Sequence, residues 1–246
     1  MLKFGVVLLL AGAPTVLYAQ NVVAPNGLAG VEGNLNNGFP FNLSNNGLTM
    51  QRYQQVYDAG EFSSIVGPKL ITTITFRPDG DAGSAFATTI TNIQINLSTT
   101  SAAVDALSTT FASNAGGDDT IVFSGALSLS SSNSGGPPRN FDVVINLATP
   151  FLYDPANGNL LLDVRNFSGE STTQFDAEFT SGDGTSRIFT LGSGVSSPTA
   201  DGADTLGLVT QFTFAAVPEP STIALTSVGV VGIAVLLRRR YKTKKK

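Results

Sequence analysis

The 246-residue chain contains no cysteine and no histidine. The absence of cysteine excludes a disulfide framework, a thiolate metal site and a cysteine nucleophile. The absence of histidine removes the commonest general base and the commonest zinc ligand, so a Ser-His-Asp triad is impossible. Tryptophan is also missing, and the 16 phenylalanines are expected to lie mainly in the core. We therefore expect a protein that is not an enzyme.

Charged residues are scarce, at 13% of the chain, which is about half the usual share. The net charge of −4 is unevenly distributed, because seven of the 14 basic residues lie in the last nine positions and another is Lys3. Residues 20–216 hold six basic and 17 acidic residues, a net charge of −11. Binding to nucleic acid requires cations clustered on a surface, so we expect no nucleic-acid partner.

The first 19 residues have the pattern of a secretory signal peptide. Lys3 supplies a positive charge, residues 4–17 are almost entirely apolar, and Ala19 is a small residue at the cleavage position before Gln20. An uncleaved membrane anchor or a buried helix is the alternative, but the segment is short for a membrane span and Pro14 lies near its end. The pattern predicts export across the inner membrane.

A second apolar segment lies near the C-terminus. Val217-Pro218-Glu219-Pro220-Ser221 precedes an apolar run over residues 222–237, and Arg238, Arg239 and Arg240 follow it. At about 1.5 Å per residue, such a run nearly crosses a hydrocarbon core of about 30 Å. Clustered arginines stay on the cytoplasmic side. The pattern predicts a transmembrane helix over residues 221–237, with residues 20–216 outside the membrane.

This tail resembles the PEP-CTERM sorting signal, which is also labelled the ice-binding-protein C-terminal domain. Pro218-Glu219-Pro220 matches the motif, residues 223–237 match the short span, and Arg238–Arg240 match the basic stop. The resemblance covers residues 217–246 and says nothing of ice binding by the rest of the chain. It implies recognition by an exosortase, a membrane protease of Gram-negative bacteria that make extracellular polysaccharide. Cleavage near the motif would transfer residues 20–216 to the cell surface or matrix. An ordinary tail anchor is the alternative.

Between the two terminal segments, apolar and polar residues alternate with a period of two, which is typical of strands with one buried face. The alternating positions are Phe141, Val143, Ile145 and Leu147; Phe175, Ala177 and Phe179; Ile93, Ile95 and Leu97; and Leu206, Leu208, Phe212 and Phe214. Further strands are expected over residues 48–57, 70–77, 120–129, 159–166 and 187–191. About nine to eleven strands joined by polar loops predict one antiparallel β-sandwich domain, jelly-roll-like, over residues 20–216. Only residues 102–112 suggest a helix.

Calcium is the only metal that the sequence suggests. Asp79 and Asp81 lie in an Asp-Gly-Asp-Ala-Gly segment that resembles the start of an acidic calcium loop. The twelfth position from Asp79 is Ile90 rather than glutamate, so the EF-hand pattern fails. We favour a solvated turn for this segment, with calcium binding as the alternative, and expect no cofactor. Other loops offer further carboxylates, namely Asp118, Asp119 and Asp183.

Two residue groups raise the question of carbohydrate chemistry. Asp176 and Glu178 share one face of a predicted strand, and paired carboxylates serve glycoside hydrolysis. Because that face alternates with an apolar one, we expect it to be a wet exterior. Tyr53 and Tyr57 also share a strand face, where core or edge positions are expected in preference to a sugar-binding surface.

Two functions follow from these patterns. The first is an exported, exosortase-sorted, non-enzymatic protein of the cell surface or extracellular matrix, associated with exopolysaccharide and held in the membrane until processing. The second is a carbohydrate-binding or carbohydrate-hydrolysing β-sandwich domain delivered by the same tail.

Overall fold

The computed structural model describes residues 19–218. Most of the predicted signal peptide, the predicted transmembrane helix, Glu219, Pro220 and Arg238–Arg240 lie outside the described residues. Within residues 19–218 the chain is all-β, and the strands pair in antiparallel fashion, as the alternation predicts. This part of the chain contains no helix that is long and apolar enough to cross a bilayer.

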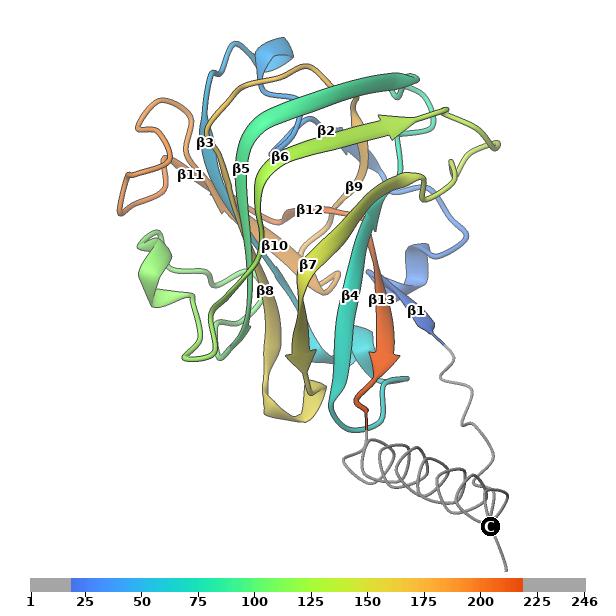
Figure 1. Cartoon of the computed structure of the whole chain (residues 1–246), viewed down its shortest axis with the longest axis vertical. Helices are drawn as coiled ribbons and strands as arrows, with labels where there is room; N and C mark the ends of the chain where they lie inside the picture. The colour runs from blue at the N-terminus through green and yellow to red at the C-terminus, as the bar shows by residue number, and fades with distance from the viewer. Residues whose placement is uncertain (1–18, 219–246) are drawn as a thin grey trace, which may run out of the picture.

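Thirteen strands and five single-turn 3₁₀ helices make up the described part (Figure 1). The strands are β1 (Gln20–Ala24), β2 (Leu35–Asn37), β3 (Gln51–Tyr57), β4 (Lys69–Phe76), β5 (Phe86–Thr100), β6 (Thr120–Ser131), β7 (Val143–Tyr153), β8 (Asn159–Asn166), β9 (Phe175–Phe179), β10 (Thr185–Phe189), β11 (Gly202–Asp204), β12 (Leu206–Leu208) and β13 (Thr210–Ala216). The 3₁₀ helices are η1 (Asn26–Leu28), η2 (Ser44–Asn46), η3 (Ala59–Phe62), η4 (Phe111–Ser113) and η5 (Pro155–Asn157).

The strands form three sheets. A four-stranded sheet has the order β1-β13-β4-β7, a six-stranded sheet the order β11-β10-β3-β8-β5-β6, and a three-stranded sheet the order β12-β9-β2. The two longest strands, β5 and β6, bend together across the top of the molecule in Figure 1. The register of this pair shifts at Ile90–Ile93, and Gly125 of β6 has a φ of 126°, a backbone conformation that favours glycine. This irregularity lets the two strands curve, because a bulge bends the strand that carries it.

One hydrophobic core joins residues from all three sheets. It is rich in aromatic rings, and the Phe41 ring lies 5.3 Å from Phe76 and 5.7 Å from Phe175, centroid to centroid. Phe62 packs edge-on against Phe212 at 5.5 Å. Burying each such ring stabilises the fold by about 1.5–3 kcal/mol relative to exposure. The expectation that phenylalanines form the core is therefore confirmed for most of them.

The strand predictions overlap β3 to β10, β12 and β13, and those for β8 and β9 agree with the observed bounds. The suggestion of a helix over residues 102–112 is wrong. This segment is a loop ending in η4, in which the Asn114 side chain donates to the Ser108 carbonyl and accepts from the Ser108 N–H. The Asn114 amide also donates to Gln54 Oε1 at 3.0 Å, which fixes the loop over β3.

Both ends of the described domain leave at the same place. β1 begins at Gln20, and its register partner in β13 is Phe214, two residues before that strand ends at Ala216. β13 lies between β1 and β4, so the strand that leads into the C-terminal tail is an inner strand of its sheet.

Candidate functional site: an acidic cluster around Arg77

Arg77 follows β4 and is 1% exposed, which is rare for an arginine without a partner. Its Nε donates to Asp176 Oδ2 at 2.6 Å, and one terminal nitrogen donates to the carbonyls of Leu28 and Val31. Asp176 lies on β9 and is fully buried. The guanidinium thus connects the end of β4 to β9 and to the loop after β1.

Glu32 and Asp79 complete the cluster. One carboxylate oxygen from each of Glu32, Asp79 and Asp176 lies within 4.8 Å of the others. Glu32 Oε1 accepts from the Gly80 N–H at 2.6 Å, whereas Glu32 Oε2 is buried and has no hydrogen-bond partner. Three carboxyl groups therefore lie close together, and one of them, Asp176, is paired with Arg77.

Burial raises the pKa of Asp176 from 3.8 to about 6. Arg77 lowers that pKa through its charge and hydrogen bond, while Glu32 raises it, and burial is the largest of these effects. The desolvation of a carboxylate favours its neutral form, because a charge is costly in a region of low dielectric constant.

A cation would have to compete with Arg77 for this cluster. Calcium takes about six to eight oxygen ligands, whereas the group offers one oxygen from each of three carboxyl groups. The Arg77 guanidinium already lies 2.6 Å from Asp176 Oδ2. The arrangement is therefore an interior ion pair of Arg77 with Asp176, with carboxylate oxygens of Glu32 and Asp79 close by.

The two calcium candidates of the sequence, Asp79 and Asp81, have different surroundings. Asp79 is 7% exposed and accepts from the backbone N–H groups of Asp81 and Ala82, as in an Asx turn. Asp81 is exposed and is not part of the three-carboxylate group. The carboxylates of the other predicted loops bond to their own surroundings: Asp118 accepts from Thr99, Asp119 from Asn96 and Asp183 from Thr185.

The expectation of a wet exterior for Asp176 and Glu178 is wrong for Asp176. β9 lies in the middle of the three-stranded sheet, and its Asp176 face packs against Arg77 instead of solvent. Glu178 is nearer the surface, where it accepts from the Asn34 side chain and the Thr180 hydroxyl. The two carboxyl groups therefore have different environments and do not form an exposed acid–base pair.

Two more buried arginines in the described part also pair with aspartates. Arg52 on β3 forms a two-point contact with Asp163 on β8, with a shortest distance of 2.6 Å, and its guanidinium lies 4.4 Å from the centre of the Phe111 ring. Arg187 on β10 makes the same kind of contact with Asp204 on β11.

The expected core positions of the β3 tyrosines are confirmed, since Tyr53 and Tyr57 are both fully buried.

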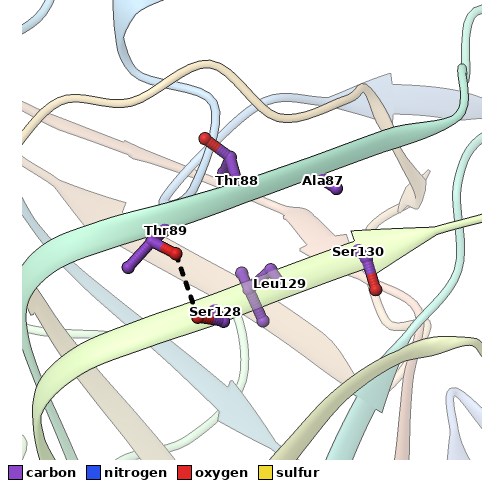
Figure 2. A pocket seen from close by; sticks show the side chains of 6 residues that line it. All are labelled: Ala87, Thr88, Thr89, Ser128, Leu129 and Ser130. Carbon is purple, nitrogen blue, oxygen red and sulfur yellow. Dashed lines mark hydrogen bonds between the residues drawn. The ribbon is translucent and has the colours of Figure 1, made fainter.

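A shallow open hollow of about 490 Å³ lies on the β5–β6 hairpin (Figure 2). The Thr89 and Ser128 hydroxyls are 2.9 Å apart across the two strands. The residues that line the hollow are uncharged and mostly small: Ala87, Thr88, Thr89, Ser128, Leu129 and Ser130. This lining offers hydroxyl groups for hydrogen bonding but no acid, base or nucleophile activated by a neighbour.

The comparisons with known proteins concern the tail. The family model described as the PEP-CTERM protein-sorting motif matches residues 216–240. Neither the curated proteins nor the solved structures give a match to the chain. The fold defines an all-β domain of antiparallel sheets, and the family match identifies the segment after it as a PEP-CTERM signal. The resemblance seen in the sequence is thus confirmed for this segment, and a signal of this kind implies export, surface sorting and processing by an exosortase.

Proposed function

We propose that this chain is an exported, exosortase-sorted, non-enzymatic protein of the cell surface or extracellular matrix, associated with exopolysaccharide. In this proposal residues 1–19 are a signal peptide, residues 20–216 are a jelly-roll-like β-sandwich, and residues 221–237 hold the precursor in the membrane. The carrying observation is the PEP-CTERM match over residues 216–240, which begins at the last residue of β13.

The position of the tail supports processing after folding. Phe212 and Phe214 of β13 are buried, and β13 pairs with both β1 and β4. A cut within Pro218-Glu219-Pro220 leaves all of these pairs intact, because the last paired residue is Ala216. The sorting segment can therefore be removed from a finished domain.

The interior supports a non-enzymatic role. In the three-carboxylate group of the described part of the chain, Asp176 is fully buried and paired with Arg77. The surface is polar and acidic, since residues 20–216 carry a net charge of −11. Such a charge favours solubility, and it favours neutral polysaccharides over anionic ones unless divalent cations form a bridge.

Cell fractionation of the native host, with and without its exosortase, tests the proposal. We expect a shortened product at the surface or in the matrix when the exosortase is present, and a full-length membrane-bound precursor when it is absent. Replacement of Pro218, Glu219 and Pro220 by alanine should produce the precursor in both strains. A full-length cytosolic product in both strains would overturn the proposal.

A carbohydrate-binding domain is the second candidate, and the hydroxyl-lined hollow of Figure 2 is the observation that favours it. A glycan array probed with the processed protein tests this function. Binding that is lost in Thr89→Val and Ser128→Ala would support it. Sugar turnover that is lost on replacing an aspartate or glutamate would instead indicate an enzyme.

A further inference from the structure

The end of the domain from which the tail leaves has an apolar surface. Leu70 of β4 pairs with Leu152 of β7 on one side and with Ala215 of β13 on the other. Paired residues of antiparallel strands point to the same face. Because the adjacent Ile71, Phe151 and Phe214 are in the core, this row points outward.

Two exposed valines lie close to this row along the chain, Val217 two residues after Ala215 and Val66 four residues before Leu70. Val217 follows β13 and is 40% exposed, and Val66 lies in the loop before β4 and is 84% exposed. Leu152 itself is 53% exposed. We call these five residues the terminal patch: Val66, Leu70, Leu152, Ala215 and Val217.

Much of the rest of this sheet face is polar, although Val144 is also exposed on it. Further from the tail, Thr73 pairs with both Asn146 and Thr213. The Thr213 hydroxyl donates to Asn21 Oδ1 at 2.9 Å, and Thr73 donates to Asn146 Oδ1 at 3.4 Å. The exposed aliphatic side chains are therefore concentrated at the end where β13 and β7 finish and β4 begins (Figure 1).

The short segment between β13 and the apolar run of the tail limits the distance between the domain and a membrane. The apolar run of the tail begins at Thr222, six residues after Ala216. Six extended residues span at most about 20 Å. Once the run enters a bilayer, the end of β13 is held within that distance of the lipid surface, and the N-terminal end of the domain lies beside it, because Gln20 pairs with Phe214.

We propose that the terminal patch rests on the surface of the bilayer that holds the precursor, so that the domain contacts lipid through this end until it is cut free. This inference rests on the proposed function, because it requires residues 221–237 to be in the membrane. Partly exposed aliphatic side chains are stabilised at the boundary between headgroups and acyl chains.

The net charge of the domain favours neutral lipids. Residues 20–216 carry a net charge of −11 and a single lysine, Lys69. Lys69 pairs with the buried Tyr153, so it lies on the sheet face opposite to Leu70 and Leu152. An acidic domain without a cluster of cations beside the patch is not attracted to anionic headgroups.

Tryptophan fluorescence tests the contact, because the chain has no tryptophan of its own. The full chain is reconstituted into phosphatidylcholine vesicles with brominated acyl chains, which quench nearby indoles. Leu152→Trp reports on the patch, and Val144→Trp is the matched control, an exposed residue of the same strand at the other end of the sheet. Val230→Trp reports on insertion of the tail.

We expect strong quenching and a blue-shifted emission for Leu152→Trp, strong quenching for Val230→Trp, and neither effect for Val144→Trp. Adding anionic lipid should reduce the quenching of Leu152→Trp.

If Val230→Trp is quenched and Leu152→Trp is not, the domain does not contact the lipid and this inference alone fails. A blue shift at Leu152→Trp without quenching would show that protein covers the patch, and equal quenching at positions 152 and 144 would show contact without preference; either overturns the inference. Absence of quenching at position 230 would overturn both this inference and the membrane-held precursor of the proposed function.

Discussion

Arg77 and Asp176 form an ion pair inside the domain, and each side chain needs the other to compensate its charge. Arg77 is 1% exposed and Asp176 is fully buried, so neither charge can be hydrated by bulk water. A buried ion pair adds little net stability compared with an apolar pair, but the loss of one partner leaves an uncompensated charge in the interior. The effect of a substitution at either position therefore follows from the charge that remains.

The first prediction concerns Asp176→Asn. This change leaves Arg77 charged and without its carboxylate, so the free energy of unfolding should fall by about 3–5 kcal/mol. Urea-induced unfolding followed by circular dichroism measures the change. Glu178→Gln on the same strand is the control, and because it lies nearer the surface it should change the free energy of unfolding by less than about 0.5 kcal/mol. Equal losses in the two variants would contradict the role given to Arg77.

The second prediction concerns pH. Burial raises the pKa of Asp183 from 3.8 to about 6, against the effect of hydrogen bonds from Thr185. The folded protein therefore holds a proton between about pH 4 and about pH 6 that the unfolded chain releases, so the free energy of unfolding should fall as the pH rises through this window. Asp183→Asn should remove on the order of 1 kcal/mol of this fall, because solvent screens a half-buried carboxyl group.

Unfolding in urea at several pH values, for the parent and for Asp183→Asn, measures this difference. Asp176 has a pKa shifted in the same direction to about 6, so part of the slope should remain in the variant. Parallel pH profiles for the two proteins would show that Asp183 is not the group responsible.

Sequence reasoning found the residue types of the acidic cluster but not the cluster itself. It identified Asp79 and Asp176 separately, the first as a loop carboxylate and the second as a solvent-facing strand residue. Glu32 and Arg77 received no role, because the sequence alone does not show that the loop after β1 folds beside the end of β4. The one available signal was the small number of cations, since each of the three buried arginines in the described part has an aspartate partner.

At the scale of the elements, the alternation of apolar and polar residues predicted the positions of strands that have one buried face. β8 and β9 follow the predicted bounds, and the inward residues of β4, β5 and β7 are in the core. β2 and β11 have only three residues each, so a period of two cannot be recognised in them. β1 was missed because its first residues are exposed and only Val22 to Ala24 are buried.

The helix suggested over residues 102–112 failed for a physical reason. A run of small residues favours a helix only if no other partner competes for its backbone. Here the Ser108 N–H and carbonyl bond to Asn114, and the Ala200 N–H donates to the carbonyl of Thr109. Tertiary contacts therefore decided a segment for which local propensity was weak.

The third prediction tests the role of β13 in the core. Phe212 is fully buried and lies 5.0 Å from the Tyr57 ring and 5.5 Å from the Phe62 ring, centroid to centroid. Phe212→Ala should lower the free energy of unfolding by about 3–5 kcal/mol, through lost burial and the cavity left behind. Phe179→Ala is the matched control, because Phe179 is 52% exposed and should lose far less. Unfolding in urea measures the free energy of unfolding of both variants. Similar losses in the two variants would contradict the core role given to Phe212 of β13.

At the scale of the whole molecule, the two chain ends and the fold act together. β1 and β13 are neighbours, so the predicted signal peptide and the sorting tail both join the domain at one end of the four-stranded sheet. Whether the signal peptide or the sorting tail attaches the domain to a membrane, the same end of the sheet therefore lies nearest the attachment. Neither this pairing nor the terminal patch was predictable from the sequence, because both depend on which strand lies beside β13.

The last prediction concerns the tail, over residues 217–246, where the sequence pattern and the family match agree on the signal. Val230→Asp combined with Val231→Asp places two charges in the centre of the apolar run. Each central charge costs about 2.5–3.5 kcal/mol on insertion scales, so the double variant should not engage the membrane stably and should not be trimmed. Val230→Leu with Val231→Leu keeps the run apolar and should be processed like the parent. Fractionation and mass measurement of the products in the native host separate these outcomes. If the aspartate variant were sorted and trimmed like the parent, a membrane span over residues 221–237 could not be part of the signal.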